Sequence, residues 1–283
     1  MRRLSKQFPI MKMSKIFGVS RSGYYRFLKE HQGKRHQEEA ELLKEITRIF
    51  YDHKKRYGSP RVYEELKTIG IQSSKNKVAK IMKTNKLVAK MPKKWKGKKL
   101  SAKEKKPNLL KRNFSAEIPN NKWVSDITYV QTAKGWVYLC AIMDLFSRKI
   151  VGHAVEGHMK KELVIKALQQ AVSRRGTQKT QVIFHSDQGV QYGANELNKY
   201  MKKLGFVGSM SGKGSCFDNA AMESFFSSYK RECVHKQTYE SLEVAQKETF
   251  NYIECYYNSK RKHSTLGYLS PNEFEKKHEN SLF

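Results

Sequence analysis

The chain has 283 residues, a length that allows one or two domains with a full-sized hydrophobic core. It carries 56 Lys and Arg against 26 Asp and Glu, so its formal net charge is +30 and a polyanion is its natural partner. The longest apolar run, Trp136–Met143, is too short to cross a bilayer, and no apolar run follows Arg2 and Arg3. We therefore expect neither a membrane-spanning helix nor a secretory signal.

The cysteines and histidines show no metal or disulfide pattern. The four cysteines, Cys140, Cys216, Cys233 and Cys255, include no Cys-x-x-Cys pair, and the nine histidines are not matched to cysteines at zinc-finger spacings. This pattern predicts reduced thiols in a cytosolic protein.

The positive charge is concentrated in the first part of the chain. Residues 1–113 hold 33 basic and 9 acidic residues, whereas residues 114–283 hold 23 and 17. Cationic side chains displace counterions from phosphates, so this asymmetry predicts that the N-terminal part binds nucleic acid. The alternative interpretation is a solvated basic surface that keeps the protein soluble.

Residues 1–39 are predicted to contain a short helix-turn-helix. Gly18 suits the turn, Ser20 suits the N-cap of a second helix, and Arg21 would begin that helix where such motifs meet DNA. A plain helical hairpin without DNA contact fits the same residues.

Residues 40–89 are predicted to form a second helical unit with a helix-turn-helix. Its helices are expected over Glu41–Tyr51, from Pro60 to about Thr68 with Arg61 in its first turn, and after a cap at Ser73 or Ser74. In the third helix one face is apolar, and the other carries Asn76, Lys77, Lys80 and Lys83. This second face is predicted to contact DNA, although a solvated lysine face gives the same pattern.

Residues 90–118 are predicted to be a basic linker. Residues 90–113 hold eleven Lys or Arg and two Pro among 24, with little hydrophobic periodicity. We expect this segment to lie along phosphates.

Residues 119–283 are predicted to form an α/β catalytic core with a helical tail. Five strands are expected at Trp123–Gln131, Trp136–Met143, Lys149–Val155, Gln181–His185 and Phe206–Met210, and three helices at Lys161–Arg174, Ala194–Leu204 and Asn219–Cys233. The order βββαβαβα predicts a mixed five-stranded sheet with flanking helices.

Three acidic residues lie in segments of this core that suggest a role in catalysis. Asp126 interrupts the first strand, Asp187 follows the fourth, and Glu223 lies in the last helix. Open α/β sheets place their sites just beyond such strand ends. Close carboxylates repel one another unless divalent cations bind them, and Mg²⁺ prefers oxygen ligands. We therefore predict a site with two Mg²⁺ ions, or Mn²⁺ as a substitute, that acts on nucleic acid.

Neighbouring polar residues have simpler interpretations. Asp144 is predicted to form a tight turn and Asp218 to cap the last helix, and a structural hydrogen bond is expected for His185. On the last helix Asn219 and Lys230 share a stripe with Glu223, because seven residues are nearly two turns, and both are candidates for DNA contact.

Long motifs in the chain resemble one family of proteins. These are Trp123-Val-Ser-Asp-Ile-Thr-Tyr, Met143-Asp-Leu-Phe-Ser-Arg-Lys-Ile-Val-Gly, His185-Ser-Asp-Gln-Gly-Val-Gln-Tyr, Asp218-Asn-Ala-Ala-Met-Glu-Ser-Phe-Phe, Tyr57-Gly-Ser-Pro-Arg and the tail from Tyr257 to Pro271. Together they are similar to the OrfB transposases of the bacterial insertion-sequence-three family. The resemblance covers nearly the whole chain, and the motifs occur in the same order.

The resemblance implies a ribonuclease-H-like core shared with retroviral integrases. It implies that Asp126, Asp187 and Glu223 bind the metals and that Lys230 contacts DNA near the cut end. The implied activity is nicking of the ends of the element and joining of the freed 3′ hydroxyl to DNA.

The same resemblance implies partners. They are the terminal inverted repeats of the element, target DNA and an upstream-frame OrfA protein or fusion, and transposition suggests a homo-oligomer on DNA. The expected location is the bacterial cytoplasm, on the nucleoid.

Further DNA contacts are predicted near the acids and in the tail. Gln188, Gln191 and Tyr192 are candidates for the terminal nucleotides, and Arg261 and His263 for DNA beyond the last long helix. Two other functions remain open: a DNA-binding regulator with an inactive core, and a structure-selective nuclease on the same fold.

Overall fold

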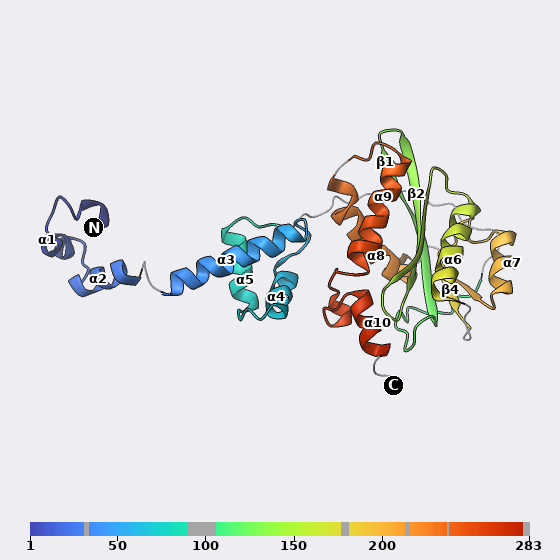
Figure 1. Ribbon diagram of the computed structural model, residues 1–283, viewed down its shortest axis with the longest axis horizontal. Coiled ribbons are helices and arrows are strands. Elements are labelled where there is room, and N and C mark those ends of the chain that lie inside the picture. Colours follow the sequence, from blue (N-terminus) through green and yellow to red (C-terminus); the bar gives the residue numbers. More distant parts are fainter. Residues whose placement is uncertain (31–33, 90–105, 177–180, 213–215, 237, 280–283) are drawn as a thin grey trace. The chain divides into compact units, whose positions relative to one another are not determined.

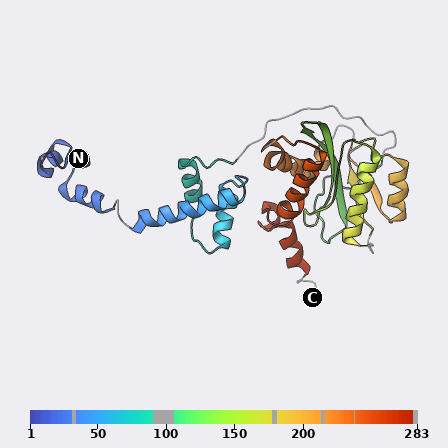
Figure 2. The same cartoon turned by 45° about the horizontal axis from the view of Figure 1, so that its top comes forward.

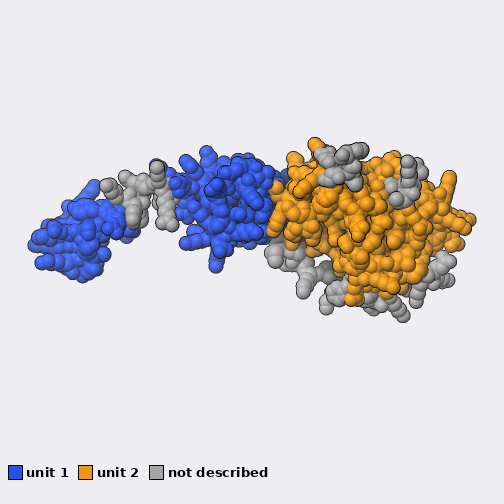
Figure 3. Space-filling view, turned by 90° about the horizontal axis from the view of Figure 1, so that it is seen from below, with its two compact units in different colours: residues 1–89 blue, residues 90–283 orange. Residues whose placement is uncertain are grey.

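The computed structural model describes residues 1–30, 34–89, 106–176, 181–212, 216–236 and 238–279. The chain divides into two compact units, Met1–Ala89 and Lys90–Phe283, which are coloured separately in Figure 3. Among the described residues, no helix is long and apolar enough to cross a membrane.

The first unit begins with the predicted helical pair. After the 3₁₀ turn η1 (Arg2–Leu4) come α1 (Ile10–Ile16) and α2 (Arg21–Glu30). Gly18 has φ +62°, and the Gly23 amide donates to Ser20 Oγ at 3.0 Å, so both the turn and the cap are confirmed. Arg21 is exposed in the first turn of α2.

Three further helices complete the first unit: α3 (Lys34–Asp52), α4 (Ser59–Thr68) and α5 (Lys75–Thr84). Pro60 lies in the first turn of α4, and the Lys77 amide donates to Ser74 Oγ at 3.2 Å as the N-cap bond of α5. Val78, Ile81 and Met82 are buried, whereas Asn76, Lys77, Lys80 and Lys83 are exposed. The helix therefore has the predicted apolar and basic faces.

The second unit contains the predicted mixed sheet. Its strands are β1 (Lys122–Thr132), β2 (Gly135–Asp144), β3 (Ile150–Glu156), β4 (Ile183–Ser186) and β5 (Val207–Met210). Their order in the sheet is β3-β2-β1-β4-β5. The first three strands are antiparallel, and β4 and β5 run parallel to β1.

Helices cover both faces of this sheet (Figures 1 and 2). On one face lie α6 (Lys161–Arg175) and α7 (Asn195–Lys203), and on the other lie α8 (Ala220–Glu232) and α9 (Leu242–Tyr252). Trp123, Ile142, Leu168 and Phe184 belong to the core beneath α6 and α7. Successive side chains of a strand point to opposite faces of the sheet. On β1, Trp123 therefore points toward α6, whereas Val124 and Asp126 point toward α8.

The tail after α9 packs onto the outer strand of the sheet. It contains the π-helical turn η4 (Ile253–Tyr257), the 3₁₀ turn η5 (Ser264–Leu266) and α10 (Pro271–Glu279). The Asn258 side chain bonds the backbone of Ile150 twice: its Oδ1 accepts from the amide and its Nδ2 donates to the carbonyl, both at 2.9 Å. One amide side chain thus satisfies both polar groups of an edge residue.

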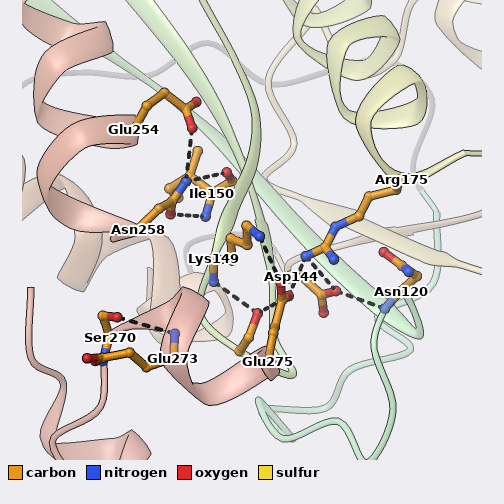
Figure 4. Close-up of polar contacts among 11 residues, drawn as sticks. Asn120, Asp144, Lys149, Ile150, Arg175, Glu254, Asn258, Ser270, Glu273 and Glu275 are labelled. Atoms are coloured by element: carbon orange, nitrogen blue, oxygen red, sulfur yellow. Dashed lines mark hydrogen bonds and ion pairs between the residues drawn. The ribbon is translucent and has the colours of Figure 1, made fainter. Parts of the chain in front are cut away.

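A buried carboxylate attaches α10 to the rest of the unit (Figure 4). Glu275 is 6% exposed and accepts from Ser147 Oγ at 2.7 Å, from Lys149 Nζ at 2.8 Å and from an Arg175 guanidinium nitrogen at 2.5 Å. Burial opposes ionisation of Glu275, but these three donors outweigh it and hold the pKa of the carboxyl below its usual value. One side chain therefore joins α10, α6 and the segment before β3.

Asp144 closes the β2–β3 connection next to this cluster. Its carboxylate accepts from the amides of Asn120 and Phe146 at 2.8 and 3.0 Å, which confirms it as a turn former. Burial raises the pKa of Asp144 to about 6, although both amides and Arg175 oppose that shift.

The predicted linker over residues 90–118 differs from the structure in its second half. Residues 90–105 lie outside the described residues, but residues 106–109 lie along β5. The Met210 amide donates to the Pro107 carbonyl at 3.2 Å, the Leu109 amide donates to Ser209 Oγ at 2.9 Å, and Leu110 is buried. The basic composition concealed this contact because Leu110 is one apolar anchor among many lysines.

We predict that Glu275→Ala lowers the free energy of unfolding of the full chain by about 3 kcal/mol, because it leaves Arg175 and Lys149 without their shared carboxylate. Chemical denaturation monitored by circular dichroism measures the change. Glu279→Ala is the matched control, because Glu279 is an exposed acid on the same helix. Equal stability of the two variants would contradict the role of Glu275.

A second prediction concerns pH. Burial lowers the pKa of His153 to about 4, with Arg174 adding to the shift and Glu254 opposing it. The unfolded chain takes up this proton first, near pH 6.5, so stability falls as the pH drops from 6.5 to 4, by up to about 3 kcal/mol. His153→Gln should lose this component of the pH dependence. His158→Gln, a change at an exposed histidine, should retain it.

Candidate active site

Two of the three predicted acids lie on neighbouring parallel strands. The pairing of β1 with β4 ends at Val124 opposite His185, and two residues further along come Asp126 and Asp187. Both carboxylates lie near the same two groups, since each raises the pKa of the buried Cys140 thiol and of the Tyr192 hydroxyl, in addition to the larger effect of burial. The sheet topology therefore brings Asp126 and Asp187 to one place.

The backbone constrains each of these carboxylates. Asp126 is 7% exposed, and its Oδ1 accepts from the Ile127 amide at 2.8 Å. Asp187 is half-buried, and its Oδ1 accepts from the Gly189 amide at 2.9 Å. A Cβ atom at residue 189 would lie 2.9 Å from that same Oδ1 and 3.0 Å from Gln191 Oε1. A side chain at residue 189 would therefore have to displace the Asp187 carboxylate.

The helix α8 runs along the part of β1 that β4 does not pair. At its start, Asn219 is buried and its Nδ2 donates to the Ser125 carbonyl at 3.0 Å, so this predicted DNA contact is engaged within the protein. Further along, Lys230 Nζ lies 4.5 Å from the centroid of the Tyr129 ring. Glu223 is exposed one helical turn after Asn219, on the same stripe. Glu223 therefore lies on the helix whose start is bonded to Ser125, the residue before Asp126.

Asp218 fixes the loop before α8, where we had predicted an N-cap. Its carboxylate accepts from the Gly212 amide at 3.0 Å, from Asn108 Nδ2 at 2.9 Å and from Arg112 Nε at 3.0 Å. The Gly212 bond and the Arg112 guanidinium hold the pKa of Asp218 below its usual value, against the effect of burial. The prediction was wrong because Asn219 is the capping position and forms no side-chain cap bond.

His185 has the structural role that we expected. It is fully buried, with Nδ1 2.8 Å from Ser209 Oγ and Nε2 3.2 Å from Ser211 Oγ. Burial lowers its pKa to about 4. The neutral ring therefore links β4 to β5 and to the residue after it.

Three predicted nucleotide contacts near Asp187 are engaged within the protein. Tyr192 is 2% exposed, and its hydroxyl lies 2.8 Å from Ser125 Oγ, so it is a core residue and that prediction was wrong. Gln191 is buried and donates to the Met159 carbonyl at 2.9 Å. Gln188 is half-buried and donates to the Ser211 carbonyl at 2.9 Å. The last two side chains order the loop around Asp187.

The two predicted contacts in the tail are also buried. Arg261 is 4% exposed and donates to both carboxylate oxygens of Glu232 and to Ser228 Oγ. His263 is 9% exposed, and its ring meets the Tyr257 ring edge-on at 4.8 Å. Both predictions of DNA contact were wrong, because Arg261 attaches the tail to α8 and His263 packs against Tyr257 within the tail.

The donor set suits a hard divalent cation. Carboxylate oxygens converge from β1 and β4, and Asn219 Oδ1 is buried without a hydrogen-bond partner among the described residues. Oxygen donors of this kind are those that Mg²⁺ prefers. Within the described ranges, however, no three His, Cys, Asp or Glu side chains are close enough together to hold a metal. Of the three predicted metal ligands, the fold already brings Asp126 and Asp187 together.

Family models match both units of the chain. An HTH-like domain matches residues 36–95, and two models described as integrase core domain match residues 116–216 and 223–278. The second integrase match begins at Glu223.

Curated relatives match along nearly their whole lengths. Transposase InsF for insertion sequence IS3A of Escherichia coli (strain K12) is 38% identical over 278 residues, covering 96% of this chain and 95% of that protein. The transposase for insertion sequence element IS904 of Lactococcus lactis subsp. lactis (strain IL1403) is 40% identical over 243 residues, covering 85% and 96%.

Solved structures with a similar fold are more distant. The HTLV-2 integrase catalytic core domain in complex with magnesium matches 56% of this chain and 96% of its own, with 16% identity and a TM-score of 0.38. The catalytic domain of Mos1 mariner transposase matches 48% and 71%, with 15% identity and a TM-score of 0.42. At these scores the likeness decides nothing about the site. The extent and identity of the matches to InsF and the IS904 protein do settle the family: the chain belongs to the IS3 family of insertion-sequence transposases.

Proposed function

We propose that this transposase cuts DNA at the ends of an insertion sequence and joins the freed 3′ hydroxyl to target DNA, using Asp126, Asp187 and Glu223. The observation that carries the proposal is the parallel pairing of β1 with β4, which brings two carboxylates together beside the start of α8. Glu223 follows on that helix within one turn of Asn219. A third acid is thus available from a separate element.

Asp126, Asp187 and Glu223 would hold Mg²⁺, in our proposal as two ions. Bound Mg²⁺ would activate the attacking oxygen and stabilise the leaving one. The protein contributes the position of the ligands: backbone amides fix Asp126 and Asp187, and Asn219 fixes the start of α8. Glu223, the exposed member, would complete the set by approaching the other two, because a cation offsets the repulsion among three carboxylates.

The first unit would bind the DNA. On α5 the exposed residues Asn76, Lys77, Lys80 and Lys83 form one face, opposite its buried side chains. Arg21 is exposed at the start of α2, and half-buried Arg61 lies with its guanidinium carbon 5.7 Å from the centroid of the Tyr57 ring. We propose that these cations contact the terminal inverted repeats and other phosphates. Two ends must be held together, so we further propose a homo-oligomer on DNA, with an upstream-frame OrfA protein as a partner or fusion.

We predict that Glu223→Gln lowers metal-dependent nicking and joining of labelled element-end DNA by at least about 100-fold, because a metal ligand is lost. Gel separation of products in Mg²⁺ or Mn²⁺ measures both steps, in the chain alone and in the upstream fusion. Glu162→Gln is the matched control, since Glu162 is also an exposed acid in the first turn of a helix of this unit. Full activity of Glu223→Gln would exclude the proposed set of ligands. DNA binding without cleavage in any form of the wild type would favour a regulator.

The close contact between Gly189 and the Asp187 carboxylate gives another test of the proposed metal site. Gly189→Ala should weaken Mn²⁺ binding by about tenfold or more, because the new methyl group must displace the Asp187 carboxylate. Isothermal titration with Mn²⁺ measures the affinity. Gly157→Ala is the control, because a Cβ there meets no atom within 4 Å. Equal Mn²⁺ affinity of both variants would remove Asp187 from the site.

A further inference from the structure

Ser125, the residue before Asp126, is bonded to both of the other elements that carry a proposed metal ligand. Its Oγ shares a hydrogen bond of 2.8 Å with the hydroxyl of Tyr192, in the loop that begins at Asp187. Its carbonyl oxygen accepts a hydrogen bond of 3.0 Å from Asn219 Nδ2, at the start of α8. One residue of β1 therefore contacts both the loop after β4 and the helix α8.

The bond between Ser125 and Tyr192 joins β1 to this loop just past the paired part of the two strands. The pairing of β1 with β4 ends at Val124 opposite His185, so Ser125 is the first residue of β1 beyond it. The Tyr192 amide donates to the Gly189 carbonyl at 3.0 Å, which closes a turn in the loop. The tyrosine side chain thus attaches this turn to β1 where the pairing of the strands has ended.

The two hydroxyls lie on the face of the sheet opposite to Asp126. Ser125 is 0% exposed and Tyr192 is 2% exposed, and Cys140 Sγ of β2 lies 3.6 Å from the serine oxygen. Neighbouring side chains on a strand point to opposite faces, so the Ser125 hydroxyl points away from a metal bound by Asp126. Any effect of this hydroxyl on the metal site must therefore pass through the backbone.

Stability alone does not require this pair of hydroxyls. Cys140 and Tyr192 belong to the otherwise apolar core beneath α6 and α7. Replacing both partners of a buried hydrogen bond by apolar groups of the same shape is often nearly neutral, because folding exchanges bonds to water for bonds within the protein. What the pair adds is a contact of defined length and direction between the strand that carries Asp126 and the loop that carries Asp187.

We propose that Ser125 is a positioning residue for the metal site, whose hydroxyl bond to Tyr192 sets the separation between Asp126 and Asp187. This inference rests on the proposed function, because that function supplies the metal. Metal ligands must be held within about 0.5 Å of the productive geometry, so a small backbone shift at Ser125 would weaken binding. Loss of either hydroxyl should therefore lower the affinity for Mn²⁺ by about tenfold.

Three variants of the full chain separate positioning from folding. Ser125→Ala and Tyr192→Phe each remove one hydroxyl and leave the other buried without this partner, so each should lower stability. The double variant removes both hydroxyls and should recover most of that stability. Isothermal titration with Mn²⁺ should nevertheless show an affinity about tenfold low in all three, because the bond is absent from each. A structural role alone would restore the affinity together with the stability.

Tyr229→Phe is the matched control for the loss of a buried hydroxyl. Tyr229 is fully buried, and its hydroxyl lies 2.7 Å from Thr249 Oγ1 in the same unit. This pair joins α8 to α9 instead of joining β1 to the loop after β4. Tyr229→Phe should therefore lower stability and leave the Mn²⁺ affinity unchanged.

Amide hydrogen exchange measures the loop directly and requires no metal. The Gly189 amide is bonded to Asp187 Oδ1 and the Tyr192 amide to the Gly189 carbonyl, so both amides should exchange slowly in the wild type. Peptides that cover residues 187–193 should exchange faster in Ser125→Ala, in Tyr192→Phe and in the double variant. Exchange of these peptides in Tyr229→Phe should match the wild type.

Three results would overturn the proposal. They are an unchanged Mn²⁺ affinity in Ser125→Ala, recovery of the affinity in the double variant, and unchanged exchange of residues 187–193 in Ser125→Ala. Each would mean that the bond between Ser125 and Tyr192 only fills the core. Failure of the proposed function would appear separately, as absence of metal-dependent cleavage in the wild type despite the expected differences in Mn²⁺ affinity and exchange.

Discussion

The parallel pairing between β1 and β4 determines the geometry of the whole site. Only Lys122–Val124 of β1 pair with β4, so the rest of β1 has no partner in β4 on that side. Asp126 and Asp187 each lie two residues beyond Val124 and His185, the last residues that pair β1 with β4. The helix α8 runs beside the part of β1 that has no partner in β4. The short β4 thus leaves the part of β1 that carries Asp126 without a β4 partner, next to the helix that carries a third acid and a lysine.

The position of α8 depends on residues far away in the sequence. Asn108 and Arg112 bind Asp218 immediately before the helix, and Arg261 binds Glu232 at its end. Each end is thus held by a carboxylate whose donors include an arginine, an arrangement stronger than neutral hydrogen bonds. The segment before β1 and the tail after α9 are therefore structural parts of the catalytic unit.

Local patterns predicted most of the secondary structure. Gly18, Ser20, Pro60 and Ser74 occupy the turn, capping and first-turn positions that their chemistry favours. The strand pattern predicted a mixed five-stranded sheet, with Asp126 in its first strand, Asp187 after its fourth and Glu223 on the helix that forms α8.

The errors concern polar side chains whose partners are distant. Arg261 looked exposed in a basic tail, yet it is buried against Glu232, 29 positions earlier. Tyr192 lies 67 positions from Ser125, with which its hydroxyl shares a hydrogen bond, and Asp218 lies 106 positions from Arg112. Periodicity cannot identify such pairs, because they arise only when the sheet brings the segments together. The one clue was Glu232 itself, an acid on the buried stripe of α8 that requires a cation.

The two hydrogen bonds between the Asn258 side chain and the Ile150 backbone have a consequence for assembly. Unpaired outer strands invite a second chain to add a strand, and proteins avoid this by covering them. Asn258 and Gln246, which donates to the Val155 carbonyl, occupy polar groups of β3, while Pro107 accepts from β5 on the opposite margin. These bonds leave fewer backbone groups through which a second copy of this transposase could extend the sheet. In the homo-oligomer proposed above, contacts between protomers would therefore involve helices, loops or the first unit, surfaces that DNA itself can bring together.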